Sequence, residues 1–202
     1  MDALYLHRND FAADPFAQFA VWYERAQASD IALPHAMTLA TADAEGRPSA
    51  RMVLLKEFSE DGFVFYTNSQ SRKGRDLRQN PRAALVFHWE VLRRQVRIEG
   101  DVAQVSAREA DAYFATRPRG SQLGAWASPQ SETIADRDDL RCEIDRLETL
   151  YGESTVPRPP NWNGYRLSPH TVEFWADQPS RLHDRFVYRR APSGWDLLQL
   201  AP

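Results

Sequence analysis

One stretch, residues 51–74, constrains the fold more than any other part of this 202-residue chain. It reads RMVLLKEFSEDGFVFYTNSQSRKG, two apolar runs rich in β-branched and aromatic residues on either side of a Ser-Glu-Asp-Gly turn that ends at Gly62. This pattern is typical of a β-hairpin. We therefore expect strands at 49–58 and 63–67, and a fold organised around antiparallel strands.

The rest of the chain supplies more short strands and a few helices. Asp14 and Pro15 are suited to the N-cap and first position of a helix that carries an apolar stripe to Ala26. Further strands are expected at 36–41, 83–89, 95–105, 164–167, 171–175, 181–188 and 195–200, with Gly100 at a bulge or close approach. Helices are expected at 71–79, 106–117 and 136–151. The composition of 117–131, RPRGSQLGAWASPQS, predicts a structured loop.

These elements indicate an α+β protein with flanking helices, built on a closed or split antiparallel β-barrel. We expect a single domain over residues 1–202, with residues 1–13 as a potentially flexible N-terminal arm. The net charge of −3 and the pI of about 6.0 argue against a general nucleic-acid binder. The lone Cys142 excludes an intrachain disulfide, and no metal site is expected. No secretory leader or apolar run of membrane-spanning length is present, so we expect a cytoplasmic protein with no membrane partner.

The hairpin carries cations at both ends, with hydroxyl groups between them. These are Arg51, Lys56, Arg72 and Lys73, together with Thr67 and Ser71. Guanidinium, ammonium and hydroxyl donors suit a phosphate monoester. A helix that begins at Ser71 would add unpaired backbone N–H groups. The spacing alone is equally consistent with an ordinary solvated hairpin.

A second basic cluster lies near the C-terminus, in RLHDR. Period-two alternation would place Arg181, His183 and Arg185 on one face of a strand. An imidazole between two guanidinium groups is costly to charge, so we expect His183 to be neutral near pH 7. The alternative interpretation is an edge strand whose charges prevent aggregation. Tyr113 and Arg117, four residues apart, would share one face of the third helix.

Taken together, the ordered motifs resemble the pyridoxine/pyridoxamine 5′-phosphate oxidases. The motifs are RMVLLK, FVFYTNSQSRKG, NPRAALVFHW, RQVRIEG, YFATRPRGSQLGAWAS, PQS, VEFW, RLHDR and the terminal LAP, and the resemblance covers about 14–202. It implies an FMN-dependent split-barrel oxidase that acts as a homodimer with the flavin at the subunit interface. The reaction implied is oxidation of pyridoxine or pyridoxamine 5′-phosphate by O2 to pyridoxal 5′-phosphate and H2O2, with ammonia from the amine, in vitamin B6 metabolism.

The resemblance also implies a role for individual residues. The FMN would be held by Arg51, Met52, Val53, Leu54, Leu55, Lys56, Tyr66, Thr67, Arg72, Lys73, Gln95, Gln130, Ser131, Trp175 and Arg185, partly from the other subunit. The substrate phosphate would be bound by Lys56, Tyr113, Arg117 and Ser121, while Arg181 and His183 would position the pyridine ring for catalysis. Arg51 and Lys56 are five residues apart, on opposite faces of a regular strand, so a bulge or an arrangement around the strand edge is required.

Two other functions are compatible with the residues. A split-barrel flavin oxidase acting on another substrate, such as one of phenazine biosynthesis, would not need Lys56 and the basic run at 117–121 for a phosphate. A non-catalytic carrier of FMN or pyridoxal phosphate would not need Arg181 and His183.

Overall fold

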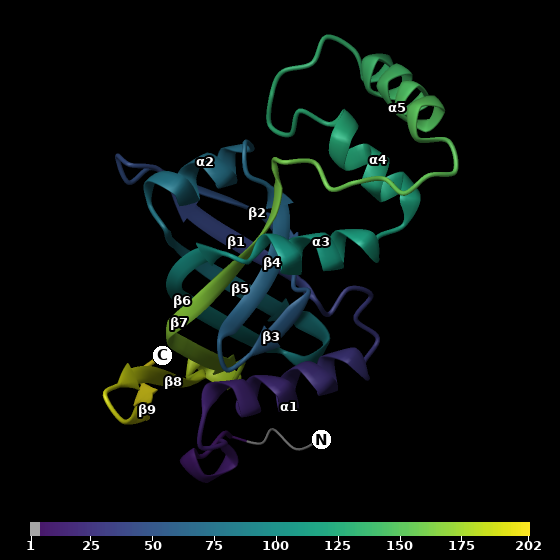
Figure 1. The fold of residues 1–202 in the computed structure, drawn as a ribbon. Coiled ribbons are helices and arrows are strands. Elements are labelled where there is room, and N and C mark those ends of the chain that lie inside the picture. The colour runs from purple at the N-terminus through teal and green to yellow at the C-terminus, as the bar shows by residue number, and fades with distance from the viewer. Residues whose placement is uncertain (1–4) are drawn as a thin grey trace.

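The computed structural model describes residues 5–202 (Figure 1). The strands are β1 (Ala36–Ala42), β2 (Pro48–Leu54), β3 (Glu57–Ser59), β4 (Gly62–Asn68), β5 (Arg82–Trp89), β6 (Arg94–Gln104), β7 (Trp162–Ala176), β8 (Asp184–Ala191) and β9 (Gly194–Leu200). The helices are α1 (Pro15–Gln27), α2 (Arg72–Gln79), α3 (Ala107–Ala115), α4 (Arg119–Ala127) and α5 (Arg137–Tyr151). Short 3-10 turns are η1 (Arg8–Asp10), η2 (Glu90–Leu92) and η3 (Pro179–Arg181).

All strands belong to one curled antiparallel sheet, in the order β2-β1-β5-β6-β7-β4-β3, with β8 and β9 added beside β7. β7 is the central strand. One of its edges pairs with β6 from Tyr165 to Ala176, while the other pairs with β4 in its first half and with β8 in its second. Branching at β7 splits the sheet into a barrel and a β8–β9 extension (Figure 1). The predicted split barrel with flanking helices is thus confirmed.

The barrel closes where β2 passes into β3. The Leu55 N–H donates to the His35 carbonyl oxygen at 2.9 Å, and the next N–H, of Lys56, donates to the Val64 carbonyl oxygen at 2.9 Å. Two consecutive residues therefore bond to parts of the sheet near its opposite ends, one just before β1 and the other in β4. The prediction of one strand over 49–58 is wrong, because the chain breaks at Leu55–Lys56 to change partners. Because of this break, Arg51 and Lys56 do not belong to one regular strand and need not lie on opposite faces.

The barrel interior is filled by aromatic and aliphatic side chains, and α1 covers one end of it (Figure 1). Phe19 of α1 lies edge-on to Phe63 and Phe87, with ring centroids 5.0 and 5.1 Å apart. The predicted N-cap is confirmed, because Asp14 accepts from the N–H groups of Phe16 and Ala17. Edge-to-face contacts of this kind add to the burial free energy that holds α1 in place.

A second, smaller core lies beneath α3, α4 and α5, the group that projects from the barrel in Figure 1. Its buried members are Phe114, Leu123, Ala127, Leu147, Val156 and Trp162. The prediction of a loop over 117–131 is wrong for residues 119–127, which form α4. Leu123 and Ala127, four residues apart, bury one face of α4, and this packing outweighs the low helix propensity of Gly120 and Gly124.

Three further differences from the predicted elements concern strand and helix limits. The expected strands at 164–167 and 171–175 are one strand, β7, opposite a register shift at Glu99/Gly100. A Cβ at Gly100 would overlap the Ser168 carbonyl oxygen, which confirms the predicted close approach. β8 begins at Asp184 rather than at residue 181. α3 ends at Ala115, so Arg117 lies beyond the helix.

Residues 5–13 of the expected N-terminal arm contact the β8 side of the molecule. The Leu6 N–H donates to an Asp184 carboxylate oxygen at 2.9 Å, and the Tyr188 hydroxyl donates to the Ala12 carbonyl oxygen at 2.7 Å. Residues 1–4 lie outside the described part of the chain. Among residues 5–202, no helix combines the length and apolar character needed to cross a bilayer.

Candidate functional site

A cleft of about 960 Å³ lies between the barrel and the α3–α4 segment. The barrel side is formed by β2, β4 and the start of α2, and the opposite side by α3, α4 and the segment after α4. Most of the predicted site residues line it: Arg51, Met52, Val53, Leu54, Lys56, Tyr66, Thr67, Arg72, Lys73, Tyr113, Arg117, Ser121, Gln130 and Ser131. The fold thus brings the hairpin, residues 113–121 and residues 130–131 to one place.

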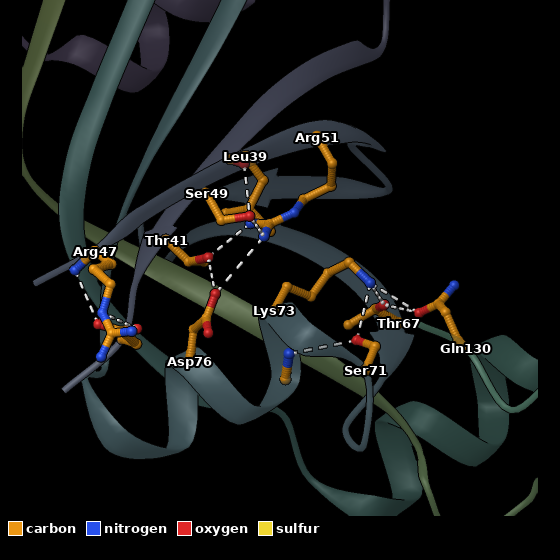
Figure 2. Close-up of polar contacts among 12 residues, drawn as sticks. Leu39, Thr41, Arg47, Ser49, Arg51, Thr67, Ser71, Lys73, Asp76 and Gln130 are labelled. Atoms are coloured by element: carbon orange, nitrogen blue, oxygen red, sulfur yellow. Dashed lines mark hydrogen bonds and ion pairs between the residues drawn. The ribbon is translucent and has the colours of Figure 1, made fainter. Parts of the chain in front are cut away.

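Lys73 is the most unusual group in the cleft. It is only 7% exposed, in the first turn of α2. Its ammonium group donates to Thr67 Oγ1 at 3.0 Å, Ser71 Oγ at 2.9 Å and Gln130 Oε1 at 2.8 Å (Figure 2). Burial, together with the nearby Arg51 and against the opposing effect of Asp76, lowers the pKa of Lys73 to about 8. A cation held by neutral oxygen atoms stabilises an anion that enters beside it.

Arg51 lies on the β2 side of the same region and is held from several directions. Its guanidinium donates to Thr41 Oγ1 and Ser49 Oγ, both at 2.7 Å, and lies 3.7 Å from a carboxylate oxygen of Asp76 (Figure 2). Thr41 in turn donates to Asp76 at 2.6 Å. These contacts fix the guanidinium in place. Burial lowers the pKa of Arg51, with Asp76 opposing and Arg72 adding to the shift.

The opposite side of the cleft presents Arg117 against aromatic rings. Its guanidinium carbon lies 4.7 Å from the ring centroid of Trp162 and 5.4 Å from that of Phe114. Its NH1 is buried and has no hydrogen-bond partner among residues 5–202. Burial lowers the pKa of Arg117, and Tyr113 opposes the shift. A buried N–H donor without a partner is costly, so an acceptor that reached this atom would be bound favourably.

Two stacked tyrosines also line the cleft. The rings of Tyr66 and Tyr113 stack with centroids 4.1 Å apart, and Tyr66 also stacks on Trp162 at 5.1 Å. Burial, assisted by Glu109, raises the pKa of Tyr66 to about 12. Its hydroxyl therefore remains a donor at neutral pH. The predicted pairing of Tyr113 and Arg117 on one helix face is wrong, although both line the cleft: the Arg117 N–H donates to the Phe114 carbonyl oxygen in a turn after α3.

The remaining predicted site residues do not line this cleft. Leu55 is 5% exposed and packs in the barrel core, so its side chain contributes to the fold. Gln95, Trp175 and Arg185 are successive partners across β6, β7 and β8, in register with one another. We call these three residues the β6–β8 ladder. Arg185 Nε donates to Glu173 at 2.8 Å, and Glu173 also accepts from Arg97 at 3.2 Å.

The predicted arrangement of Arg181, His183 and Arg185 on one strand face is wrong. Arg181 ends the η3 turn with φ of 62°, and Arg185 alone of the three lies in β8. His183 does stand near the ladder, with its ring 4.6 Å from that of Trp175. Its neighbour is a carboxylate rather than two guanidinium groups, because Nδ1 lies 3.0 Å from an Asp177 oxygen. The neutral state of His183 near pH 7 stays a prediction.

Several cleft residues were missed by the sequence reasoning. They are Ser49, Ala50, Asn68, Thr116, Pro118, Gly124, Ala125, Ser128 and Trp162. Those in 118–128 were missed because that segment was predicted to be a loop with no fixed face. Trp162 could have been found only by recognising that β7 begins there. The supporting pair Thr41 and Asp76 has no local signal, since the two residues are 35 positions apart.

The sequence model described as "Pyridoxamine 5'-phosphate oxidase" matches residues 24–151. The chain belongs to this family. A second model, described as the pyridoxine 5'-phosphate oxidase C-terminal dimerisation region, matches residues 162–202, the segment that contains β7, β8 and β9. The dimerisation region of the family thus includes Trp175 and Arg185 of the β6–β8 ladder, and Arg181 and His183.

Curated relatives in this family are similar over nearly their whole length. A pyridoxine/pyridoxamine 5'-phosphate oxidase from Acaryochloris marina is 56% identical over 94% of this chain and 87% of its own. One from Cupriavidus necator is 54% identical over 98% of this chain and 93% of its own. Family membership therefore rests on full-length similarity.

Solved structures give the same fold. PhzG from Burkholderia lata, solved in complex with tetrahydrophenazine-1-carboxylic acid, has a TM-score of 0.93 and 34% identity, over 100% of this chain and 98% of that one. A pyridoxamine 5'-phosphate oxidase-related, FMN binding protein from Nostoc punctiforme has a TM-score of 0.74 and 20% identity, over 95% of this chain and 100% of that one. The second shows the shared split-barrel fold.

Proposed function

We propose that the protein oxidises pyridoxine 5′-phosphate or pyridoxamine 5′-phosphate to pyridoxal 5′-phosphate with FMN as cofactor. O2 accepts the electrons and becomes H2O2, and the amine substrate also consumes water and releases ammonia. The observation that carries the proposal is the cleft itself, which holds a buried ammonium group and, on its other side, a buried guanidinium N–H that has no partner in the described part of the chain. Two phosphate-bearing molecules, cofactor and substrate, would occupy these two positions.

The residues on the barrel side fit FMN. Lys73, Arg51 and Arg72 would hold its phosphate, and the exposed apolar side chains of Met52 and Leu54 offer a surface for its ring. The lowered pKa of Lys73 supports this assignment, since a bound phosphate offsets the cost of the buried charge. When bound, FMN supplies the acceptor for a hydride equivalent from the C4′ carbon of the substrate.

The residues across the cleft fit the substrate phosphate. Arg117 offers a planar guanidinium already fixed by Trp162, and Lys56, Tyr113 and Ser121 line the same space. Binding a phosphate remote from the reacting carbon orients the substrate at little entropic cost in the chemical step. Because Tyr66 remains protonated, it acts in this site as a hydrogen-bond donor and an aromatic wall.

We further infer that the active protein is a homodimer in which the β6–β8 ladder, Arg181 and His183 complete the partner's cleft. Two observations support this inference: these residues do not line the cleft of their own chain, and all except Gln95 fall in the matched dimerisation region. Arg181 and His183 would then position the pyridine ring against the flavin. The cytoplasmic location stays a prediction.

Oxidation of a phenazine precursor is a second candidate, favoured by the likeness to PhzG. That structure holds a ligand named as a carboxylic acid, without a phosphate in its name. The cationic groups on both sides of the present cleft favour a phosphorylated substrate, as do the names of relatives at 52–56% identity.

The test is an anaerobic absorbance titration of the purified, FMN-loaded protein. Pyridoxine 5′-phosphate or pyridoxamine 5′-phosphate should bleach the flavin band, and air should restore it with formation of H2O2. Bleaching by a dihydrophenazine carboxylic acid alone would support the second candidate. A flavin band unmoved by all three compounds would overturn both oxidase assignments.

A further inference from the structure

The segment between β7 and β8 is built around one carboxylate, Asp177. Its Oδ1 lies 3.0 Å from His183 Nδ1, and its Oδ2 accepts from Arg93 Nε at 2.9 Å and also from Arg93 NH2. The Asp177 N–H donates to the Arg93 carbonyl oxygen at 3.0 Å, so backbone and side chain bind the same residue. The Asp177 carboxylate therefore links Arg93, at the end of η2, to the imidazole of His183.

The backbone around this carboxylate is strained. Arg93, Ser180 and Arg181 have φ of 54°, 58° and 62°, in the left-handed region that non-glycine residues seldom adopt. Two of them are consecutive, in the short turn that leads to His183. Such strain is retained where surrounding contacts over-determine the conformation. Here the bond from Gln178 Nε2 to Asp184 at 2.6 Å closes the base of the turn.

The imidazole is held at one nitrogen by two groups with opposite demands. The Gln178 backbone N–H donates to His183 Nδ1 at 3.1 Å, and this bond requires a lone pair on Nδ1. The Asp177 carboxylate at 3.0 Å can bind Nδ1 only if that nitrogen carries a proton. The carboxylate is an anion at neutral pH, because hydrogen bonds from Arg93 lower the pKa of Asp177. A charge-assisted N–H···O bond from Nδ1 to the carboxylate would be stronger than the bond from the amide, so we expect the proton to favour Nδ1.

We propose that Asp177 is a positioning residue for His183, which keeps the proton on Nδ1 and the lone pair on Nε2. Arg93 holds the carboxylate, the carboxylate orients the ring, and the ring presents Nε2 as an acceptor. His183 is 22% exposed in its side chain, so a ligand can reach the ring. This inference deepens the proposed function and rests on it for the identity of that ligand, a phosphorylated pyridine in the partner's cleft.

The isosteric variant Asp177→Asn gives the sharpest test. Arg93 can bind only the oxygen of the new amide, so the amide NH2 would face Nδ1 and force it to accept. The proton should then move to Nε2. Asp177→Ala should also move the proton to Nε2. The variant removes the carboxylate and leaves the Gln178 N–H, which donates to Nδ1. Selective 15N-histidine labelling of the FMN-loaded protein reads both ring nitrogens directly, and His183→Gln assigns the signal among five histidines.

A matched control is present in the same chain. Asp101 also lies between a histidine and an arginine, 2.8 Å from His170 Nε2 and 3.8 Å from Arg82 Nε, but the pair is more than half exposed and outside the cleft. Asp101→Asn should leave the His183 signals and the turnover unchanged. Asp177→Asn should lower kcat about tenfold to hundredfold with a change in KM below threefold, as loss of an orienting group does.

The two proposals fail in different ways. An unchanged His183 tautomer in both Asp177 variants would overturn the positioning role, whatever the enzyme oxidises. A wild-type protein that shows the Nδ1-protonated ring but oxidises neither B6 phosphate would overturn the proposed function and leave the positioning role in place.

Discussion

The cleft and a second surface differ in how their cations are paired. We call this second surface, which carries Arg97, Glu173 and Arg185, the β6–β8 face. In the cleft, Lys73 bonds to neutral oxygen atoms and Arg117 lies against aromatic rings with one buried N–H unpaired among the described residues. On the face, Arg97 and Arg185 both bond to Glu173. The cleft therefore carries positive charge that an anionic ligand can neutralise, whereas the face is neutralised already.

Because of this difference, we expect the cleft cations to bind anionic ligands and the paired cations of the face to fix local geometry. A buried cation without an anionic partner is destabilising in the empty protein and becomes favourable when an anion binds. A cation that already has a carboxylate partner contributes geometry more than net charge. We therefore expect substitutions of the cleft cations to change ligand affinity strongly and stability little, and substitution of the Glu173 carboxylate on the face to cause a small loss of stability.

The largest effect is expected for Lys73→Met. The variant removes an ammonium group that would form charge-assisted bonds to the FMN phosphate, each worth about 1.5–3 kcal/mol, so FMN affinity should fall about 100-fold or more. Quenching of flavin fluorescence on titration of the apoprotein measures this. The control is Arg78→Gln, at an exposed position in the last turn of the same helix. An affinity within threefold of wild type would remove Lys73 from the phosphate site.

Arg117→Ala should act on the substrate rather than on the cofactor. Loss of a guanidinium that binds the substrate phosphate should raise KM by about ten- to a hundredfold, from roughly 1.5–3 kcal/mol, and lower kcat less. Steady-state oxidation of pyridoxine 5′-phosphate gives both constants. FMN affinity, measured in parallel, should stay near the wild-type value. An unchanged KM would contradict this assignment.

The third effect is a pH dependence of FMN affinity, which we expect to arise from Lys73 in the cleft. Burial disfavours the ammonium form, so the pKa of Lys73 falls from 10.5 to about 8, and the charge that binds phosphate is present below pH 8 and lost above it. FMN affinity should therefore weaken about tenfold between pH 7 and pH 9, if the neutral amine contributes nothing. Lys73→Arg keeps its charge and should flatten the profile. A wild-type profile without a break near pH 8 would mean that Lys73 stays charged.

The sequence predicted most of the cleft because its residues lie in local motifs. The hairpin, the helix start near Ser71 and the cations beside it follow from short patterns, and the structure places them together. A barrel of antiparallel strands also followed from the strand count, whereas its split type followed from the family resemblance. What alternation could not predict is where a strand breaks. Leu55–Lys56 changes partner through hydrogen bonds to His35 and Val64, and the nearer of these, Val64, is eight residues away from Lys56.

The region around His183 shows the same limit more clearly. Alternating charge in RLHDR indicates a strand, but Pro179 and the positive φ at Ser180 and Arg181 make a turn instead. The turn is determined by Asp177 and Arg93, which are 84 positions apart. No local pattern carries a contact of that length. Likewise, α4 forms because Leu123 and Ala127 are covered by the second core, although their neighbours have low helix propensity.

The smallest effect is expected on the β6–β8 face, where Glu173→Gln removes the anion shared by Arg97 and Arg185. Glu173 is 8% exposed but its arginine partners are partly solvated, so the free energy of unfolding should fall by only about 1 kcal/mol. Urea unfolding at fixed protein concentration measures this as a lower midpoint with an unchanged slope. The control is Glu99→Gln, which removes an exposed partner of Arg97 and should change stability by less than about 0.5 kcal/mol.

Equal losses of stability in Glu173→Gln and Glu99→Gln would mean that burial of the shared carboxylate adds nothing. A larger loss in Lys73→Met than in Glu173→Gln would reverse the assignment of stability to the face and affinity to the cleft.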